Sequence, residues 1–389
     1  MVQGQYFSIL DLGSSQMRML VTNGEDPAQV IAHYEVESEG VAHGAIIDLE
    51  LAAKALNTLI SVVQDQIEYK VSSVICTFSG ESITSLNSHG VVKVRKQEVT
   101  AYDIGELVKT AQAVSLEKKT LIHVIPKSFK VDNQTGISDP TGMFGVRLEG
   151  DFHLIAADQG VCENIIRCLQ KVGLSLEGFV YTPLGLAFSA LSEDEKQQGV
   201  VIVDMGSGTT DCSVYLNGAL EWSHSLPIGG DSITRDIAHC LKIDNITAEK
   251  VKLALSQDRN MDLDVVLDGG VLCSQVVSVI ESRYAQIIKM IDRMLIKEGL
   301  RHRLARGYVF CGQAARYANL EEVFANNNIT PFRKGQYAQE GAGALSQSWL
   351  GAIGLVYFYK NMMNADTPVA NLQRKGKVSK FFDWLETYL

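Results

Sequence analysis

A glycine-rich segment between two apolar runs, residues 200–215, constrains the fold of this chain more than any other stretch. Four β-favouring residues lead into Asp204, and a second apolar run begins after a group of small residues. This pattern predicts a β-hairpin whose tip carries few side chains. Backbone N–H groups and hydroxyls in such a tip are typical of a phosphate cradle. The candidate donors are Gly206, Ser207, Gly208, Thr209 and Thr210.

Two aspartates flank this tip, Asp204 before it and Asp211 after it. A carboxylate repels phosphate, so we interpret both as partners of a Mg²⁺ ion that lies between them and the phosphate. An ordinary glycine-rich hairpin is the alternative for this stretch taken alone.

The N-terminal segment, residues 6–21, repeats the same order of residues. An apolar run reaches Asp11, Gly13 follows with the hydroxyls of Ser14 and Ser15, and a second apolar run comes next. Two such hairpins predict two related halves that hold one nucleotide between them. The chain contains neither G-x-x-x-x-G-K-[ST] nor a G-x-G-x-x-G segment that opens a helix, so the common nucleotide motifs are excluded.

The paired hairpins resemble the phosphate loops of the superfamily that contains actin, Hsp70 and the sugar kinases. The resemblance implies an α/β, actin-like ATPase fold of two lobes, each with a mixed β-sheet flanked by helices, and with ATP and Mg²⁺ between them. It also implies that Asp11, Asp204 and Asp231 contact the metal through water. Gly312 resembles the start of the adenosine loop, where Gln313 replaces a second glycine.

Three further features follow from the same resemblance: a turn, a charged pair and a replaced acid. The Gly230-Asp231 turn faces the nucleotide in relatives, and Asp231 is expected to N-cap the helix that begins at residue 232. Glu249 and Lys252, spaced i,i+3, resemble a pair that contacts the adenosine, although a solvated salt bridge explains the spacing equally well. A helix that begins at Pro183 resembles one of the two helices that connect the lobes in relatives. Many relatives place an acidic residue directly before this proline, where this chain has Thr182. We therefore expect weak or no ATP hydrolysis and name no catalytic residue.

Residues 85–161 are predicted to form an inserted α+β subdomain in the first lobe. Within it, a segment from His123-Val124-Ile125-Pro126 to Gly145-Val146-Arg147-Leu148 closely resembles a signature of the FtsA family of bacterial cell division proteins. This resemblance covers essentially the whole chain. The domain boundaries that it implies are 1–84, 162–195 and 346–360 for the first core; 85–161 for the insert; 196–230 and 304–345 for the second core; and 231–303 for an outer subdomain.

Composition limits the possible functions. The formal net charge is −10, which argues against a nucleic-acid partner. The seven cysteines include no C-x-x-C pair, and Cys76, Cys212 and Cys311 lie in apolar runs, as expected for reduced core thiols in the cytosol. His123 and His153 lie in strand-like runs and are expected to be packed or strand-edge residues and not metal ligands. We find no signal peptide and no run long enough for a membrane-spanning helix.

The end of the chain has its own organisation. Residues 361–376 are polar and predict a flexible linker. Residues 377–389 are amphipathic at helical spacing, which favours a helix lying on an anionic membrane surface; a terminal helix packed on its own domain is the alternative. The side chains expected to enter the membrane are Val378, Phe381, Phe382, Trp384, Leu385, Tyr388 and Leu389.

The FtsA resemblance implies a protein on the cytoplasmic face of the inner membrane at the division site. It implies filament formation, binding of the FtsZ C-terminal peptide to the outer subdomain, and recruitment of later division proteins. We place the acidic peptide at Arg293, Lys297 and Arg301; a solvated basic face is the alternative. The rival functions are a scaffold for type IV pilus assembly and a phosphotransferase or ATPase of the superfamily.

Overall fold

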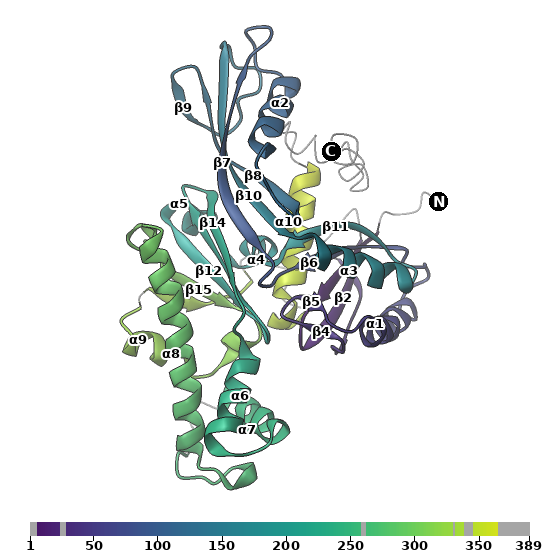
Figure 1. The fold of residues 1–389 in the computed structure, drawn as a ribbon, viewed down its shortest axis with the longest axis vertical. Helices are drawn as coiled ribbons and strands as arrows, with labels where there is room; N and C mark the ends of the chain where they lie inside the picture. Colours follow the sequence, from purple (N-terminus) through teal and green to yellow (C-terminus); the bar gives the residue numbers. More distant parts are fainter. Residues whose placement is uncertain (1–5, 24–28, 258–261, 330, 338–344, 365–389) are drawn as a thin grey trace.

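The computed structural model describes residues 6–23, 29–257, 262–329, 331–337 and 345–364. Two lobes meet at a pair of crossing helices, and a smaller insert projects from one end of the molecule (Figure 1). Both predicted hairpins are present, because β1 pairs antiparallel with β2 and β12 pairs antiparallel with β13. No helix within the described ranges is both long and apolar enough to cross a membrane.

The first lobe is built on a five-stranded sheet in the order β11-β6-β1-β2-β3. The hairpin strands and β3 are antiparallel, whereas β6 runs parallel to β1 and to β11. Its elements are β1 (Tyr6–Leu12), β2 (Gln16–Asn23), β3 (Val30–Glu37), β4 (Val41–Ala42), β5 (Ala45–Ile46), α1 (Leu49–Gln64), β6 (Ser73–Phe78), α3 (Gln159–Lys171) and β11 (Ser175–Tyr181).

The second lobe repeats this arrangement, with a sheet in the order β14-β13-β12-β15-β16. Again a hairpin and a third antiparallel strand lie on one side, and two parallel strands lie on the other. The predicted pair of related lobes is confirmed. The elements are α5 (Glu193–Gln198), β12 (Val200–Met205), β13 (Thr210–Leu216), β14 (Ala219–Leu226), α6 (Gly230–Leu241), α7 (Asn245–Gln257), η1 (Asp268–Gly270), α8 (Cys273–Lys297), η2 (Arg301–Arg303), β15 (Tyr308–Cys311), η3 (Ala314–Arg316), α9 (Leu320–Asn326) and β16 (Phe332–Lys334).

The insert has a separate four-stranded sheet, in the order β7-β10-β8-β9, and its own apolar core. Helix α2 packs through Leu107 against Phe129 and Phe152 of this sheet. The loop of the FtsA-like signature is fixed by Asp132, whose carboxylate accepts from the backbone N–H groups of Val146 and Arg147. The elements are β7 (Thr84–Lys93), α2 (Ala101–Gln112), β8 (Lys119–Val131), β9 (Gln134–Ile137) and β10 (Arg147–Asp158).

Two helices form the hinge between the lobes, α4 (Thr182–Ala190) and α10 (Leu350–Asn364), the second preceded by η5 (Gln347–Trp349). They cross at glycines: a Cβ on Gly354 would lie 1.9 Å from the carbonyl oxygen of Gly185. The expected close crossing is therefore confirmed. Because α10 continues to Asn364, the prediction that the linker begins at residue 361 is wrong; no helix-breaking residue occurs before Pro368.

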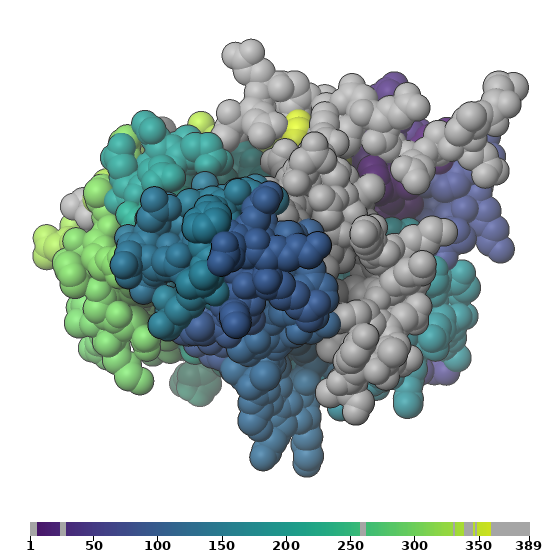
Figure 2. All heavy atoms as spheres, turned by 90° about the horizontal axis from the view of Figure 1, so that it is seen from above, coloured from purple at the N-terminus to yellow at the C-terminus, as the bar shows by residue number. Residues whose placement is uncertain are grey.

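Polar contacts join the insert to the second lobe, where β7, β8 and β10 meet β14 (Figure 1). In the view from above, the blue atoms of the insert lie beside the teal and green atoms of the second lobe (Figure 2). The His153 ring lies 2.8 Å from Asn87 Oδ1 through Nδ1 and 3.0 Å from Ser223 Oγ through Nε2. The Asn87 amide nitrogen donates to the Glu221 carbonyl oxygen, so Asn87 Oδ1 accepts the proton of His153 Nδ1. The neutral imidazole thus has a partner at both nitrogens. His153 is a packed residue, as expected.

Protonation of His153 is expected to weaken the folded state in acid. Burial, with a smaller contribution from nearby Lys127, lowers its pKa to about 3. An unfolded histidine titrates near ~6.5, so only the unfolded chain takes up the proton between these values. The contribution of neutral His153 to the free energy of unfolding is therefore fully present above pH ~6.5 and is lost as the pH falls toward 3. The loss from this residue is about 2 kcal/mol at pH ~5. Urea unfolding at pH 7.5 and 5 should show this loss in the wild type. His153→Gln should reduce it by the same amount; an unchanged pH dependence would contradict the assignment.

The cysteines follow the composition argument. Six of them are buried free thiols, including Cys76, Cys212 and Cys311, and Cys240 is exposed. The backbone N–H of Tyr181 donates to Nε2 of His123 at 2.9 Å, so this histidine is also a packed residue.

Candidate functional site

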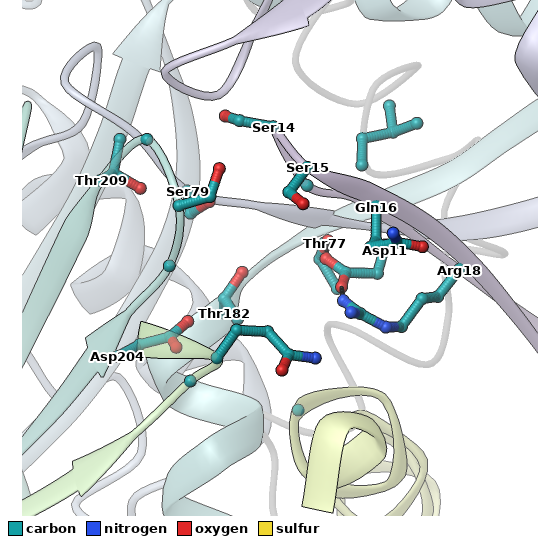
Figure 3. Close-up of a pocket in the computed structure, with 18 of the residues that line it drawn as sticks. Asp11, Ser14, Ser15, Gln16, Arg18, Thr77, Ser79, Thr182, Asp204 and Thr209 are labelled. Carbon is teal, nitrogen blue, oxygen red and sulfur yellow. Dashed lines mark hydrogen bonds and ion pairs between the residues drawn. The ribbon is translucent and has the colours of Figure 1, made fainter. Parts of the chain in front are cut away.

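The tips of the two hairpins face each other across a cleft between the lobes (Figure 3). The hinge helices close its base through Thr182, Leu186 and Gly351. Most of the predicted phosphate-loop residues line it. They are Asp11, Gly13, Ser14, Ser15, Asp204, Gly206, Ser207, Gly208, Thr209 and Gly312.

The second hairpin touches the first lobe at Gly208. A Cβ at this position would lie 2.7 Å from Ser14 Oγ and 3.2 Å from the backbone nitrogen of His43, so only glycine permits the approach. The His43 ring lies 2.9 Å from the Gly208 carbonyl oxygen through Nδ1. A carbonyl oxygen only accepts, so Nδ1 carries the ring proton and donates to it. This bond joins the two lobes beside Gly44 and Gly208, which line the cleft.

The two predicted metal-facing carboxylates on the strands have different surroundings. Asp11 accepts from Thr77 Oγ1 at 2.7 Å and from Arg18 Nη1 at 3.3 Å. For Asp204, burial first and then the nearby carboxylates of Asp211 and Asp11 raise the pKa to about 8. An excess of carboxylates in a partly dry cleft favours a divalent cation. The described residues contain no cluster of three His, Cys, Asp or Glu side chains able to hold a metal. Asp11 and Asp204 supply the carboxylate oxygens that Mg²⁺ prefers, and both would contact a hydrated ion through water.

Two residues of the second hairpin do not face the cleft. Asp211 is buried and accepts from the Gly80 N–H at 3.3 Å and from Thr209 Oγ1 at 3.1 Å, and burial raises its pKa to about 6. The Thr210 hydroxyl donates to the Ile228 carbonyl oxygen at 2.6 Å. The interpretation of Asp211 as a metal partner and of Thr210 as a phosphate donor is wrong. Both side chains form hydrogen bonds that hold the loop in place.

The predicted N-cap of α6 is also wrong. Gly229 occupies that position, because a Cβ there would lie 2.4 Å from the Ser207 carbonyl oxygen. Asp231 lies in the first turn of the helix, outside the residues that line the cleft, and its carboxylate accepts from Ser207 Oγ at 3.1 Å. Its contact therefore supports the phosphate loop, and no cation-facing geometry is seen for it.

The expected adenosine contacts form a group next to this turn. Lys252 Nζ lies 2.6 Å from Glu249 Oε2 and donates to the Gly230 carbonyl oxygen at 3.2 Å. A Cβ on Gly230 would lie 3.5 Å from that of Ala314, which follows Gly312 and Gln313. The structure thus brings the turn, the Glu249–Lys252 pair and the 312–314 loop together beside the cleft. The pair is half-buried and tied to the turn, unlike a solvated salt bridge.

Several lining residues did not stand out in the sequence, namely Gln16, Arg18, Gly44, Thr77 and Ser79; His43, which bonds to Gly208, was also missed. Arg18 gave one usable signal, a basic residue inside the otherwise apolar run 17–21. Thr182 lines the cleft as expected, and its hydroxyl lies 3.4 Å from the Phe78 carbonyl oxygen, to which it donates. A threonine used in this way cannot act as the carboxylate base that activates water.

Family comparisons agree with the fold and the insert. Residues 80–156 match the family model described as the SHS2 domain inserted in FtsA, and residues 201–344 match that of cell division protein FtsA. A cell division protein FtsA of Pseudomonas aeruginosa is 30% identical over 340 residues, which is 84% of this chain and 82% of that protein. The chain belongs to the FtsA family of cell division proteins. The FtsA of Escherichia coli K12 is 29% identical over 90% of this chain and 89% of that protein.

Solved structures support the actin-like fold of this FtsA family member. A PilM-PilN type IV pilus biogenesis complex gives a TM-score of 0.65 at 13% identity, over 90% of this chain and 98% of that one. MreB 5 of Spiroplasma citri bound to AMPPNP gives 0.54 at 15% identity, over 96% and 99%. At these identities the likeness shows the fold alone. The expected α/β fold of two lobes with an insert is confirmed.

The predicted peptide-binding residues lie at the sheet end of α8. Arg293 and Lys297 are exposed there, whereas Arg301 donates to Asp292 Oδ1 at 2.5 Å. Nearby, the Arg306 N–H donates to the Gly199 carbonyl oxygen, next to α5. The outer helix α7 lies at the opposite end of α8 (Figure 1). These basic residues therefore lie at the end of α8 that is nearest the central sheet, and their assignment to the outer subdomain stays a prediction. The amphipathic residues 377–389 and residues 365–376 lie outside the described part.

Proposed function

We propose that this FtsA family member is an ATP-binding, actin-like protein that assembles at the membrane surface and tethers the FtsZ ring to it. The observation that carries the ATP site is the pair of glycine-tipped hairpins facing each other across one cleft. Backbone N–H groups and hydroxyls of both tips would hold the phosphates. Asp11 and Asp204 would hold Mg²⁺ through water, and the metal would neutralise phosphate charge. Gly230, Glu249, Lys252 and Gly312 would lie along the adenosine.

The decisive experiment measures nucleotide binding directly. A titration of the full chain with a fluorescent ATP analogue, in Mg²⁺ and in EDTA, should show saturable binding that unlabelled ATP displaces. Absence of binding in both conditions would refute the ATP site. Phosphate release should be weak or absent, because Thr182 replaces the expected acid and is bonded to the backbone.

Membrane attachment is proposed from the terminal residues 377–389. One short amphipathic helix binds a bilayer only marginally, and joining many copies in a filament makes later contacts effectively intramolecular. We therefore expect truncation before Lys377, or Trp384→Glu, to abolish sedimentation with anionic liposomes while ATP binding is retained. A filament-defective variant with an intact terminus should sediment poorly. If that variant bound liposomes as well as the wild type, the coupling between assembly and attachment would be refuted.

The FtsZ C-terminal peptide is proposed to bind the exposed basic side chains at the sheet end of α8, and the family membership supports such a partner. Charge reversal of Arg293 and Lys297 to Glu should weaken peptide binding about tenfold or more at low salt, because like charges then face each other. Arg301 is left intact because it pairs with Asp292. Lys54→Glu, an exposed charge reversal on α1, serves as the matched control. Unchanged peptide affinity in the α8 variant would place the site elsewhere. Recruitment of later division proteins belongs to the same proposal.

A further inference from the structure

Three charged side chains stand in a row across adjacent strands of the first lobe. The register pairs Asp11 of β1 with Arg18 of β2, and Arg18 with Glu35 of β3. The Arg18 guanidinium donates to Asp11 Oδ2 at 3.3 Å and to Glu35 Oε2 at 2.8 Å. Its side chain is 8% exposed, against 26% for Asp11 and 45% for Glu35. The cation is therefore buried between one carboxylate that lines the cleft and one that is exposed.

Arg18 is also the only basic residue among the described residues that line this cleft. The phosphate tips contribute neutral donors, and the Asp11 carboxylate contributes negative charge, whereas burial raises the pKa of Asp204 to about 8 and keeps most of that side chain neutral near pH 7. A nucleotide brings further negative charge into the same space. The balance of charge thus depends on Arg18 and on any cation that enters with the ligand.

The Asp11 carboxylate already has partners at both oxygens, Thr77 at Oδ1 and Arg18 at Oδ2. A divalent cation that approaches Asp11 must compete with the guanidinium for this carboxylate or repel it. Glu35 holds the other side of Arg18 and reduces the positive charge directed at Asp11. Arginine keeps its charge at all relevant pH values, so the competition cannot be relieved by deprotonation.

We propose that Arg18 is the internal counter-ion of the nucleotide cleft: it opposes divalent cation binding at Asp11 in the empty protein and supplies positive charge to bound phosphates. Glu35 is its positioning residue. This inference rests on the proposed function, because it assigns charge roles within that site. If Arg18 has this role, its removal should raise the affinity for a divalent cation and lower the affinity for nucleotide.

The test uses the full chain and Mn²⁺ alone as the probe, followed by electron paramagnetic resonance without nucleotide. Arg18→Gln should bind Mn²⁺ about tenfold more tightly than the wild type, since a like charge within ~4–6 Å is removed. Arg18→Lys should remain near the wild type. Glu35→Gln should bind Mn²⁺ more weakly than the wild type, because Arg18 then pairs with Asp11 alone. Glu37→Gln is the matched control, an exposed glutamate two residues along the same strand, and should change nothing.

A second measurement separates this inference from the ATP site itself. ATP affinity in EDTA should fall about tenfold in Arg18→Gln and recover in Arg18→Lys. If the wild type binds no nucleotide, the proposed function fails while the Mn²⁺ comparison still decides the competition. If the wild type binds ATP but Arg18→Gln changes neither affinity, the counter-ion role is refuted alone. Circular dichroism checks each fold; should Arg18→Gln misfold, unchanged Mn²⁺ binding in Glu35→Gln refutes the proposal.

Discussion

Nucleotide binding is expected to be lost in the Gly208→Asp variant. The new Cβ would lie 2.7 Å from Ser14 Oγ and 3.2 Å from the His43 nitrogen, so the two lobes could no longer approach at this point. The new carboxylate would also join Asp204 beside the phosphates, and an unpaired like charge in a partly buried site costs several kcal/mol. We expect an affinity loss of 100-fold or more, measured by titration with a fluorescent ATP analogue.

The matched control is Gly160→Asp, which adds the same side chain to the first turn of α3. A Cβ at Gly160 meets no atom within 4 Å, and an acid at a helix N-terminus is favourable. This variant should bind nucleotide like the wild type. Wild-type affinity in Gly208→Asp, with the control also intact, would show that the paired hairpins hold something other than phosphate.

The sequence was sufficient for features that depend on neighbouring residues. Each hairpin is encoded within about twenty residues by apolar runs, a glycine-rich tip and a flanking aspartate, so both were predicted together with the two-lobed fold. The spacing of Glu249 and Lys252 on one helix allowed a solvated salt bridge equally well, and only the family resemblance pointed to the adenosine. The family signature in the insert extended the prediction to the subdomain around it.

Features that depend on pairing between distant strands were missed. Arg18 becomes meaningful only when the register places it between Asp11 and Glu35. Thr210 and Asp211 were assigned to the ligand. In the structure, the Thr210 hydroxyl donates to the Ile228 carbonyl oxygen and the Asp211 carboxylate accepts from the Gly80 N–H of the first lobe. Asp231 was expected to be the N-cap because aspartate is a common capping residue. The N-cap is Gly229 instead, because the backbone of Ser207 packs so closely against it that only glycine fits.

The charge pattern alone also did not predict where the basic residues of α8 lie in the second lobe. The basic residues after Lys289 form one run in the sequence, but α8 spans the lobe from the outer helices to the central sheet (Figure 1). The loop that follows its C-terminal end contacts Gly199, directly before β12. Arg301 forms an ion pair with Asp292, and its guanidinium lies 5.4 Å from the centre of the Tyr308 ring, so it is less available to a partner than Arg293 and Lys297.

The hinge crossing provides two glycines on one helix with opposite expected effects. A Cβ on Gly354 would lie 1.9 Å from the Gly185 carbonyl oxygen and 2.8 Å from Ser189 Oγ, and the backbone of α4 cannot yield without moving the helix. A Cβ on Gly351, one turn earlier, would meet only side-chain carbons at 3.7 Å or more. Both glycines lie within α10, where alanine is the better helix former.

Gly354→Ala is therefore expected to destabilise the folded protein by about 2–4 kcal/mol, as overpacked cores do, because α4 and α10 must separate. Gly351→Ala is expected to stabilise it by about 0.5–1 kcal/mol, since the methyl group fits and the unfolded chain loses freedom. Urea unfolding of both variants and the wild type measures the two signs. Since Thr182 and Leu186 on α4 line the cleft, separation of the helices should also lower ATP affinity in Gly354→Ala. Equal stability of the two variants would show that the helices do not cross at these glycines, and the hinge assignment would then be wrong.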